Sequence, residues 1–188
     1  MKINHNILSN LSFFDSLLKE RKIINDSEIY LEEKGNNSRW IQGASRTSID
    51  ALTDNIVFTI KINKVVNKYG IMLRCKDLCN EPYLRFDSDG AAHVNCDENI
   101  PLLDRQILTP HFNTFDEQGR EFAYHNSILK DSKEAEAIKD NVDFGINLFC
   151  NESNSFLANR DIPTHIDLTT LPNLEIEIDF IQNNIKFD

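Results

Sequence analysis

The sequence lacks the signatures of several common protein classes. Its six glycines are scattered, and none begins a phosphate-binding loop or a dinucleotide-binding pattern. No serine lies in a G-x-S-x-G sequence, which excludes the nucleophile elbow of α/β-hydrolases. No window approaches the about 18 consecutive apolar residues of a membrane span, and the first residues mix polar with apolar types. We therefore expect neither a signal peptide nor a membrane span, and a cytoplasmic location.

Cysteine is scarce and unpatterned. The four cysteines form no C-x-x-C pair, and Cys75 and Cys79 have no matching Cys/His pair elsewhere. We interpret all four as reduced structural thiols of an intracellular protein. His93, His111 and His125 could supply metal ligands together with an aspartate, but their spacing matches no metal signature. We therefore expect no metal and no cofactor.

Positive charge is the scarcer sign, with 20 Lys and Arg against 30 Asp and Glu and a net charge of −10. An acidic surface repels a polyanion, so we expect no nonspecific binding of nucleic acid. The charges are unevenly spread: residues 55–86 have six basic and two acidic side chains, whereas residues 131–188 have four basic and twelve acidic ones. The basic segment allows local contact with phosphate, and it is equally compatible with an ordinary mixed surface.

The 188 residues fit a single domain, 1–188. Apolar residues at three- and four-residue spacing predict an N-terminal helix over 6–24. A second apolar stripe, which follows a D-x-x-E helix start, predicts a helix over about 132–150. Segments rich in β-branched and aromatic residues predict a sheet core over about 28–126. The predicted fold class is α+β: an antiparallel sheet of about 6–8 strands with the two helices packed on it.

The C-terminal strand region, 163–188, contains an acidic alternating pattern. Apolar residues alternate with Glu175, Glu177 and Asp179, which is typical of a half-buried strand with an acidic outer face. Alternate residues along a strand recur about every 6–7 Å, close to the spacing of backbone phosphates. These carboxylates could therefore bind a protein partner by imitating nucleic acid. A solvated sheet face explains the pattern equally well.

The segment 84–95 has the pattern of a β-hairpin. The Asp-Gly dipeptide at 89–90 is typical of a two-residue turn. Pairing outward from this turn sets Phe86 opposite His93. His93 is therefore predicted to lie on the same face as Phe86.

A second hairpin is predicted over 110–125, with its turn at 116–119. Alternation along its first strand places His111 and Asn113 on one face. A register slip of one residue would reverse the return strand, so no face is assigned to His125.

The two hairpins carry candidate catalytic groups. Histidine gives or takes a proton near neutral pH, and cleavage of a phosphodiester needs a proton acceptor, a proton donor and a cation. His93, His111 and Arg85 are the right residue types, and Tyr124 is a further candidate donor. In the alternative interpretation, both histidines only form hydrogen bonds to neighbouring strands.

An ordered set of short motifs lies within roughly residues 55–150: Arg85-x-Asp87, His93-x-Asn95-x-Asp97, Pro110-His111-x-Asn113-x-Phe115 and Phe122-Ala123. The set resembles a family of uncharacterised small bacterial and phage proteins. The pattern of that family runs R-x-D, H-x-N-P-D-G, H-x-H-x-[FY] and an aromatic-Ala pair before a closing helix. The resemblance implies a role in bacterial and phage conflict, such as antiviral defence, counter-defence or a toxin–antitoxin system, with no established reaction.

Three positions depart from the family pattern. Cys96 replaces the proline, Glu98 replaces the glycine, and Asn113 replaces the second histidine of H-x-H. If the histidine pair is the active feature of the family, its loss removes the activity from this chain.

Two functions are therefore predicted as alternatives. The first is a non-enzymatic acidic interaction protein of bacterial or phage conflict, which binds and blocks a basic, nucleic-acid-handling partner through the acidic C-terminal strand. The net charge, that strand and Asn113 favour it. The alternative is a small metal-independent nuclease or toxin-like hydrolase, with His93 and His111 as acid and base and Arg85 against the phosphate. Nucleic acid would then be contacted only locally, through residues 55–86.

Overall fold

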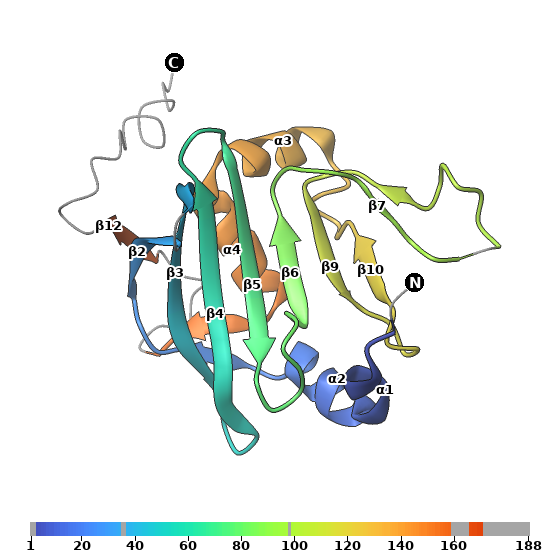
Figure 1. Cartoon of the computed structure of the whole chain (residues 1–188), viewed down its shortest axis with the longest axis horizontal. Helices are drawn as coiled ribbons and strands as arrows, with labels where there is room; N and C mark the ends of the chain where they lie inside the picture. The colour runs from blue at the N-terminus through green and yellow to red at the C-terminus, as the bar shows by residue number, and fades with distance from the viewer. Residues whose placement is uncertain (1–2, 35–36, 98, 159–165, 171–188) are drawn as a thin grey trace.

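The computed structural model describes residues 3–34, 37–97, 99–158 and 166–170, and Figure 1 shows their arrangement. Within these ranges, ten strands form one curled sheet, two more form a small separate sheet, and four helices accompany them, which confirms the α+β fold class. The helices are α1 (His5–Ser9), α2 (Leu11–Lys19), α3 (Ser132–Asp140) and α4 (Val142–Glu152). The strands are β1 (Lys22–Ile24), β2 (Glu28–Lys34), β3 (Asn37–Ile49), β4 (Thr53–Asn63), β5 (Lys68–Cys75), β6 (Leu84–Asp87), β7 (His93–Val94), β8 (Gln106–Ile107), β9 (His111–Phe115), β10 (Glu121–Tyr124), β11 (Ser155–Leu157) and β12 (Asp167–Thr170).

The large sheet has the strand order β10-β9-β6-β5-β4-β3-β1-β11, with β2 and β12 attached beside β3. Most pairs are antiparallel, as predicted, but β1 pairs with β11 and β12 with β2 in parallel. The sheet is therefore mixed, because the segments after α4 return to strands near the N-terminus. The predicted acidic strand that contains Glu175, Glu177 and Asp179 lies outside the described residues.

The two faces of the central strands differ in chemistry. Along β4, Ile56, Phe58 and Ile60 are fully buried, and the residues between them point to the other side. We call the buried side the core face and the other side the open face. In Figure 1, α4 lies behind the sheet, on the core face, and β3, β4, β5 and β6 turn their open face toward the viewer.

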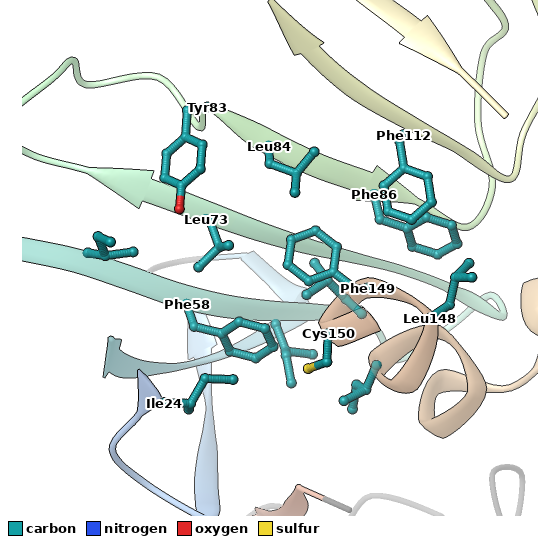
Figure 2. Packing of buried hydrophobic residues seen from close by; sticks show 14 of the residues in the cluster. Ile24, Phe58, Leu73, Tyr83, Leu84, Phe86, Phe112, Leu148, Phe149 and Cys150 are labelled. Carbon is teal, nitrogen blue, oxygen red and sulfur yellow. The ribbon is translucent and has the colours of Figure 1, made fainter. Parts of the chain in front are cut away.

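Aromatic rings join α4 to the sheet. The Phe149 ring lies 5.8 Å from that of Phe58 and 6.2 Å from that of Phe112, measured between ring centroids. Phe112 in turn packs 5.2 Å from Phe86 on the neighbouring strand (Figure 2). This cluster fixes β6 and β9 side by side, with Arg85, Asp87, His111 and Asn113 turned to the open face.

The predicted helix over 6–24 is shorter and broken. It consists of α1 and α2, which meet at Asn10, and the chain then enters β1 with Ile24 fully buried. The prediction failed at its end because residues 22–24 pair with both β3 and β11. Tertiary pairing outweighs the local helical pattern there.

The predicted helix over about 132–150 is likewise divided, into α3 and α4. Asp131 caps α3 as predicted, because its side chain accepts hydrogen bonds from the backbone N–H groups of residues 133 and 134. Asn141 then ends α3 and caps α4 in the same way. The Tyr69 hydroxyl from β5 lies in hydrogen-bonding contact with the carbonyls of Ile138 and Asn141, so the sheet holds this junction.

Gly145 provides a test of how tightly α4 packs on the sheet. A Cβ atom at this position would collide with the ring and hydroxyl of Tyr69. Replacing glycine by alanine in a helix ordinarily stabilises it by about 1 kcal/mol, but overpacking costs about 1–3 kcal/mol. We predict that Gly145→Ala lowers the free energy of unfolding in a denaturant titration. The exposed substitution Asn151→Ala in the same helix should change it by less than about 0.5 kcal/mol, and a stabilised Gly145→Ala variant would contradict this packing.

Candidate functional site

The polar residues of β6 and β9 face each other across the open face of the sheet. The pairing of these strands sets Asp87 opposite His111 and Arg85 opposite Asn113. The predicted hairpin around residues 89–90 does not form, because β6 pairs with β5 and β9 instead of with the segment that follows it. The aromatic packing of β9 described above accounts for this outcome.

Asp87 is the centre of a hydrogen-bonded cluster. Its Oδ2 atom accepts hydrogen bonds from Nε of Arg85 and from Nδ2 of Asn113, each at 2.9 Å. Arg85 also places a terminal nitrogen 3.3 Å from Glu121. Asn113 is buried, and among the described residues its Oδ1 atom has no hydrogen-bond donor. The cluster therefore holds the cation in place and keeps one buried acceptor unpaired.

His111 lies beside this cluster and is only 3% exposed. Its Nδ1 lies 3.2 Å from the Leu108 carbonyl, and its Nε2 lies 3.8 Å from Oδ2 of Asp87. Because a carbonyl can only accept, Nδ1 carries the hydrogen and the neutral ring keeps a lone pair on Nε2. Burial lowers the pKa of His111, and the nearby carboxylate of Asp87 offsets only part of this effect.

The His93 side chain lies next to His111, although His93 belongs to a different strand, β7. Its ring lies 6.5 Å from the His111 ring between centroids, at an interplanar angle of 78°. The prediction that His93 shares the face of Phe86 is therefore wrong: His93 lies on the open-face side with His111, whereas Phe86 is in the core. His93 is only half-buried, so its imidazole is the more accessible of the two.

His93 belongs to the segment that connects β6 to β9, and this segment determines its position. Here β7 pairs with β8 in the small sheet, and this arm extends beyond the main sheet at the right of Figure 1. Asn95 attaches the arm to β10: its side-chain amide donates to the Ala123 carbonyl and accepts from the Ala123 N–H, both at 2.7 Å. This two-bond contact resembles the pairing of two strands and fixes the segment after His93 to the main sheet.

The structure separates Tyr124 from the histidines. Its ring stacks on Phe112, which belongs to the core, and its hydroxyl donates to Glu152 of α4 at 2.9 Å. Burial and the adjacent Glu152 carboxylate raise the pKa of Tyr124, which makes its hydroxyl a poor acid. Tyr124 therefore supports the fold near the site and is not positioned to transfer a proton there.

His125 contacts the site indirectly. Its Nε2 atom lies 2.8 Å from the Leu108 carbonyl, the acceptor that His111 also uses. In the described part of the chain, no group of three His, Cys, Asp or Glu side chains is arranged to hold a metal ion. None of the described helices is long and apolar enough to cross a membrane.

A cavity of about 390 Å³ adjoins the cluster on the open face of the sheet. Arg85 and Asp87 line it, so one side of the cavity is the cluster itself. Its remaining lining comes from β3, β4, β5 and the chain around β6 and β9: Trp40, Lys61, Lys68, Tyr69, Gly70, Met72, Asp89, Gly90, Ala91 and Thr109.

No known protein-family model, curated protein sequence or solved structure matches this chain. The resemblance to small bacterial and phage proteins thus stays a prediction. The chemistry of the site is argued from its own geometry.

Because burial depresses the pKa of His111, the native protein binds fewer protons there than the unfolded chain does. The stability that neutral His111 contributes is complete above about pH 6.5 and is lost as the pH falls toward the lowered pKa. We predict that the free energy of unfolding falls more steeply with decreasing pH in wild type than in His111→Gln, below about pH 6.5. The two slopes should differ by at most about 1.4 kcal/mol per pH unit. Denaturant titrations from neutral to acidic pH measure this difference. His5→Gln, at an exposed histidine, should keep the wild-type slope, and equal slopes in His111→Gln and wild type would contradict the assignment.

Proposed function

We propose that the protein is a small hydrolase that cleaves phosphodiester bonds of nucleic acid by proton transfer at His93. The observation that carries this proposal is the meeting of the His93 and His111 rings, 6.5 Å apart, beside the Arg85–Asp87 pair. Two imidazoles and a guanidinium from three separate strands converge on a face of the sheet that also holds a ligand-sized cavity.

The accessibility of the two histidines assigns them different roles. His93 is half-buried and is the group that touches the substrate. His111 is buried and acts as a positioning residue, with its ring edge against His93 and its Nδ1–H held by Leu108. Asp87 orients Arg85 by accepting its Nε–H, and the same carboxylate lies 3.8 Å from Nε2 of His111.

Water is the only reactant that the proposed cleavage needs besides the phosphodiester. His93 accepts a proton from an attacking water molecule as the oxygen of that water bonds to phosphorus, and the bond from phosphorus to the leaving oxygen breaks. The leaving oxygen takes a proton from water, and the hydroxide so formed removes the proton from His93. The Arg85 guanidinium stabilises the negative charge that develops on the phosphate oxygens.

A second candidate function, the binding of a protein partner, is favoured by a different observation. The loop between β7 and β8 exposes Ile100, Leu102 and Leu103, the last of them 81% exposed. Clustered exposed apolar side chains are typical of interaction surfaces. The sequence predicted this binding function from the acidic C-terminal strand, which lies outside the described residues. The exposed loop is therefore the structural observation that supports partner binding.

The hydrolase is tested with labelled RNA and DNA. We expect wild type to cleave at least one of them in the presence of EDTA, and His93→Ala to lose about 100-fold or more of the rate, the usual contribution of a general acid–base group. His5→Ala is the matched control and should retain activity. Cleavage that persists in His93→Ala would overturn the role of His93, and absence of cleavage by wild type would overturn the function.

The positioning role of His111 predicts a different signature. His111→Asn retains a donor at the position of Nδ1, toward the Leu108 carbonyl, so it should preserve part of the activity and shift the pH dependence of kcat. His111→Ala should lose more. A purely structural role would change the stability of both variants and leave the pH profile of the folded enzyme unchanged.

The binding function is tested through the exposed loop. Leu102→Glu/Leu103→Glu should abolish a complex that wild type forms with a basic, nucleic-acid-handling protein, as measured by co-purification from cells that express both. Cleavage of nucleic acid by the same variant should remain unchanged. Undiminished complex formation would exclude this loop as the binding surface.

A further inference from the structure

The cavity on the open face exists because one strand position has no side chain. The register of the sheet places Lys61, Gly70, Asp87 and His111 in one row across β4, β5, β6 and β9. Neighbouring strands are about 4.8 Å apart, so the backbones that carry Lys61 and Asp87 are separated by about 10 Å. Gly70 leaves the space between them empty. We call this space the Gly70 cavity.

The Gly70 cavity is locally cationic in a protein of net charge −10. Lys61, Lys68 and Arg85 line it together with Asp87 and Asp89. Each carboxylate has a cation of its own: Arg85 pairs with Asp87 at 2.9 Å, and Lys139 of α3 lies 3.6 Å from Asp89. Among the described side chains, three cations and two carboxylates line the cavity, and Lys139 adds a fourth cation beside Asp89. This balance of charge favours an anionic ligand.

An aromatic wall accompanies these cations. Trp40 from β3 lines the cavity, and Nζ of Lys61 lies 4.2 Å from the centroid of its ring. Lys61 is thereby held beside the indole and above the cavity floor. An aromatic surface next to cations fits a ligand that has both a planar base and a phosphate.

We propose that the Gly70 cavity binds one nucleotide of the substrate, with its phosphate at Lys61 and Lys68 and its base against Trp40. The choice of a nucleotide rests on the proposed function, since Arg85 and Asp87 belong to both the cavity and the histidine site. A nucleotide in this cavity lies directly beside Arg85. The phosphodiester next to the bound nucleotide then lies on the side of Asp87 that faces His111 and His93.

Binding is tested separately from cleavage, in the His93→Ala background, by calorimetric titration with AMP and UMP. We expect binding of at least one of them, weakened about 10-fold or more by Lys61→Gln/Lys68→Gln, which removes two charge-assisted contacts. The matched control is Lys64→Gln/Lys133→Gln, which removes the same charge at an ion pair with Glu33 and at an exposed helical site. The control variant should bind as the background does.

A second variant fills the cavity without changing charge. A Cβ at position 70 would lie 3.4 Å from the Phe86 carbonyl oxygen and 3.6 Å from Oδ1 of Asp87, so the backbone accommodates a side chain there. Gly70→Val should fold, as judged by circular dichroism, and should lose nucleotide binding.

The outcomes of the two assays are distinguishable. Nucleotide binding that depends on Lys61 and Lys68, without cleavage by the wild-type protein, supports the Gly70 cavity and overturns the hydrolase. Absence of nucleotide binding at millimolar concentration, or binding unchanged in Lys61→Gln/Lys68→Gln and in Gly70→Val, overturns the cavity assignment whatever the cleavage assay shows. Inorganic phosphate that binds as tightly as AMP and UMP overturns the assignment of a nucleotide.

Discussion

The carboxylate of Asp87 is the interaction on which the site depends. One oxygen atom accepts hydrogen bonds from Arg85 and Asn113 and faces the Nε2 atom of His111. Without this carboxylate the guanidinium would lose its Nε partner, and the buried imidazole would lose a nearby negative charge that offsets part of its desolvation. Asp87 therefore sets the geometry of the cation and offsets part of the effect of burial on the pKa of His111.

The same two strands build the core and the site. Phe86 packs on Phe112, which packs on Phe149 of α4, and this packing holds β6 against β9. Asp87 follows Phe86 and His111 precedes Phe112, and the two polar residues face each other on the opposite side of the sheet. Substitutions in the aromatic cluster are thus expected to disturb the site although they do not touch it, because a shift of one residue would reverse the faces.

The sequence predicted the local features more reliably than the long-range ones. The α+β class, the hairpin of β9 and β10 with its turn at 116–119, and the cap at Asp131 follow from neighbouring residues, and the structure confirms them. The β6–β9 pairing joins segments that are far apart in the chain, and no local pattern in the sequence indicates it. The predicted hairpin at 89–90 was wrong for this reason.

The same contrast between local and long-range features holds for the candidate site. His93, His111 and Arg85 were predicted from residue type, and the structure brings them together, whereas it places Tyr124 on the core side. Asn113, which stands where the family pattern has a second histidine, turns out to bind Asp87. Gly70 was missed, because an absent side chain becomes informative only when the residues beside it in the sheet are known. The period-two alternation of residues 84–87 and 111–115 would have revealed the cluster once these strands were paired.

The most direct test of this account is nuclear magnetic resonance of the imidazole rings across a pH titration. The account predicts that His111 is the Nδ1–H tautomer at neutral pH, that its pKa lies below the usual value of about 6.5, and that its ring protons show a nuclear Overhauser contact with those of His93. The Nε2–H tautomer with a pKa at or above the usual value, and no contact between the rings, would contradict it.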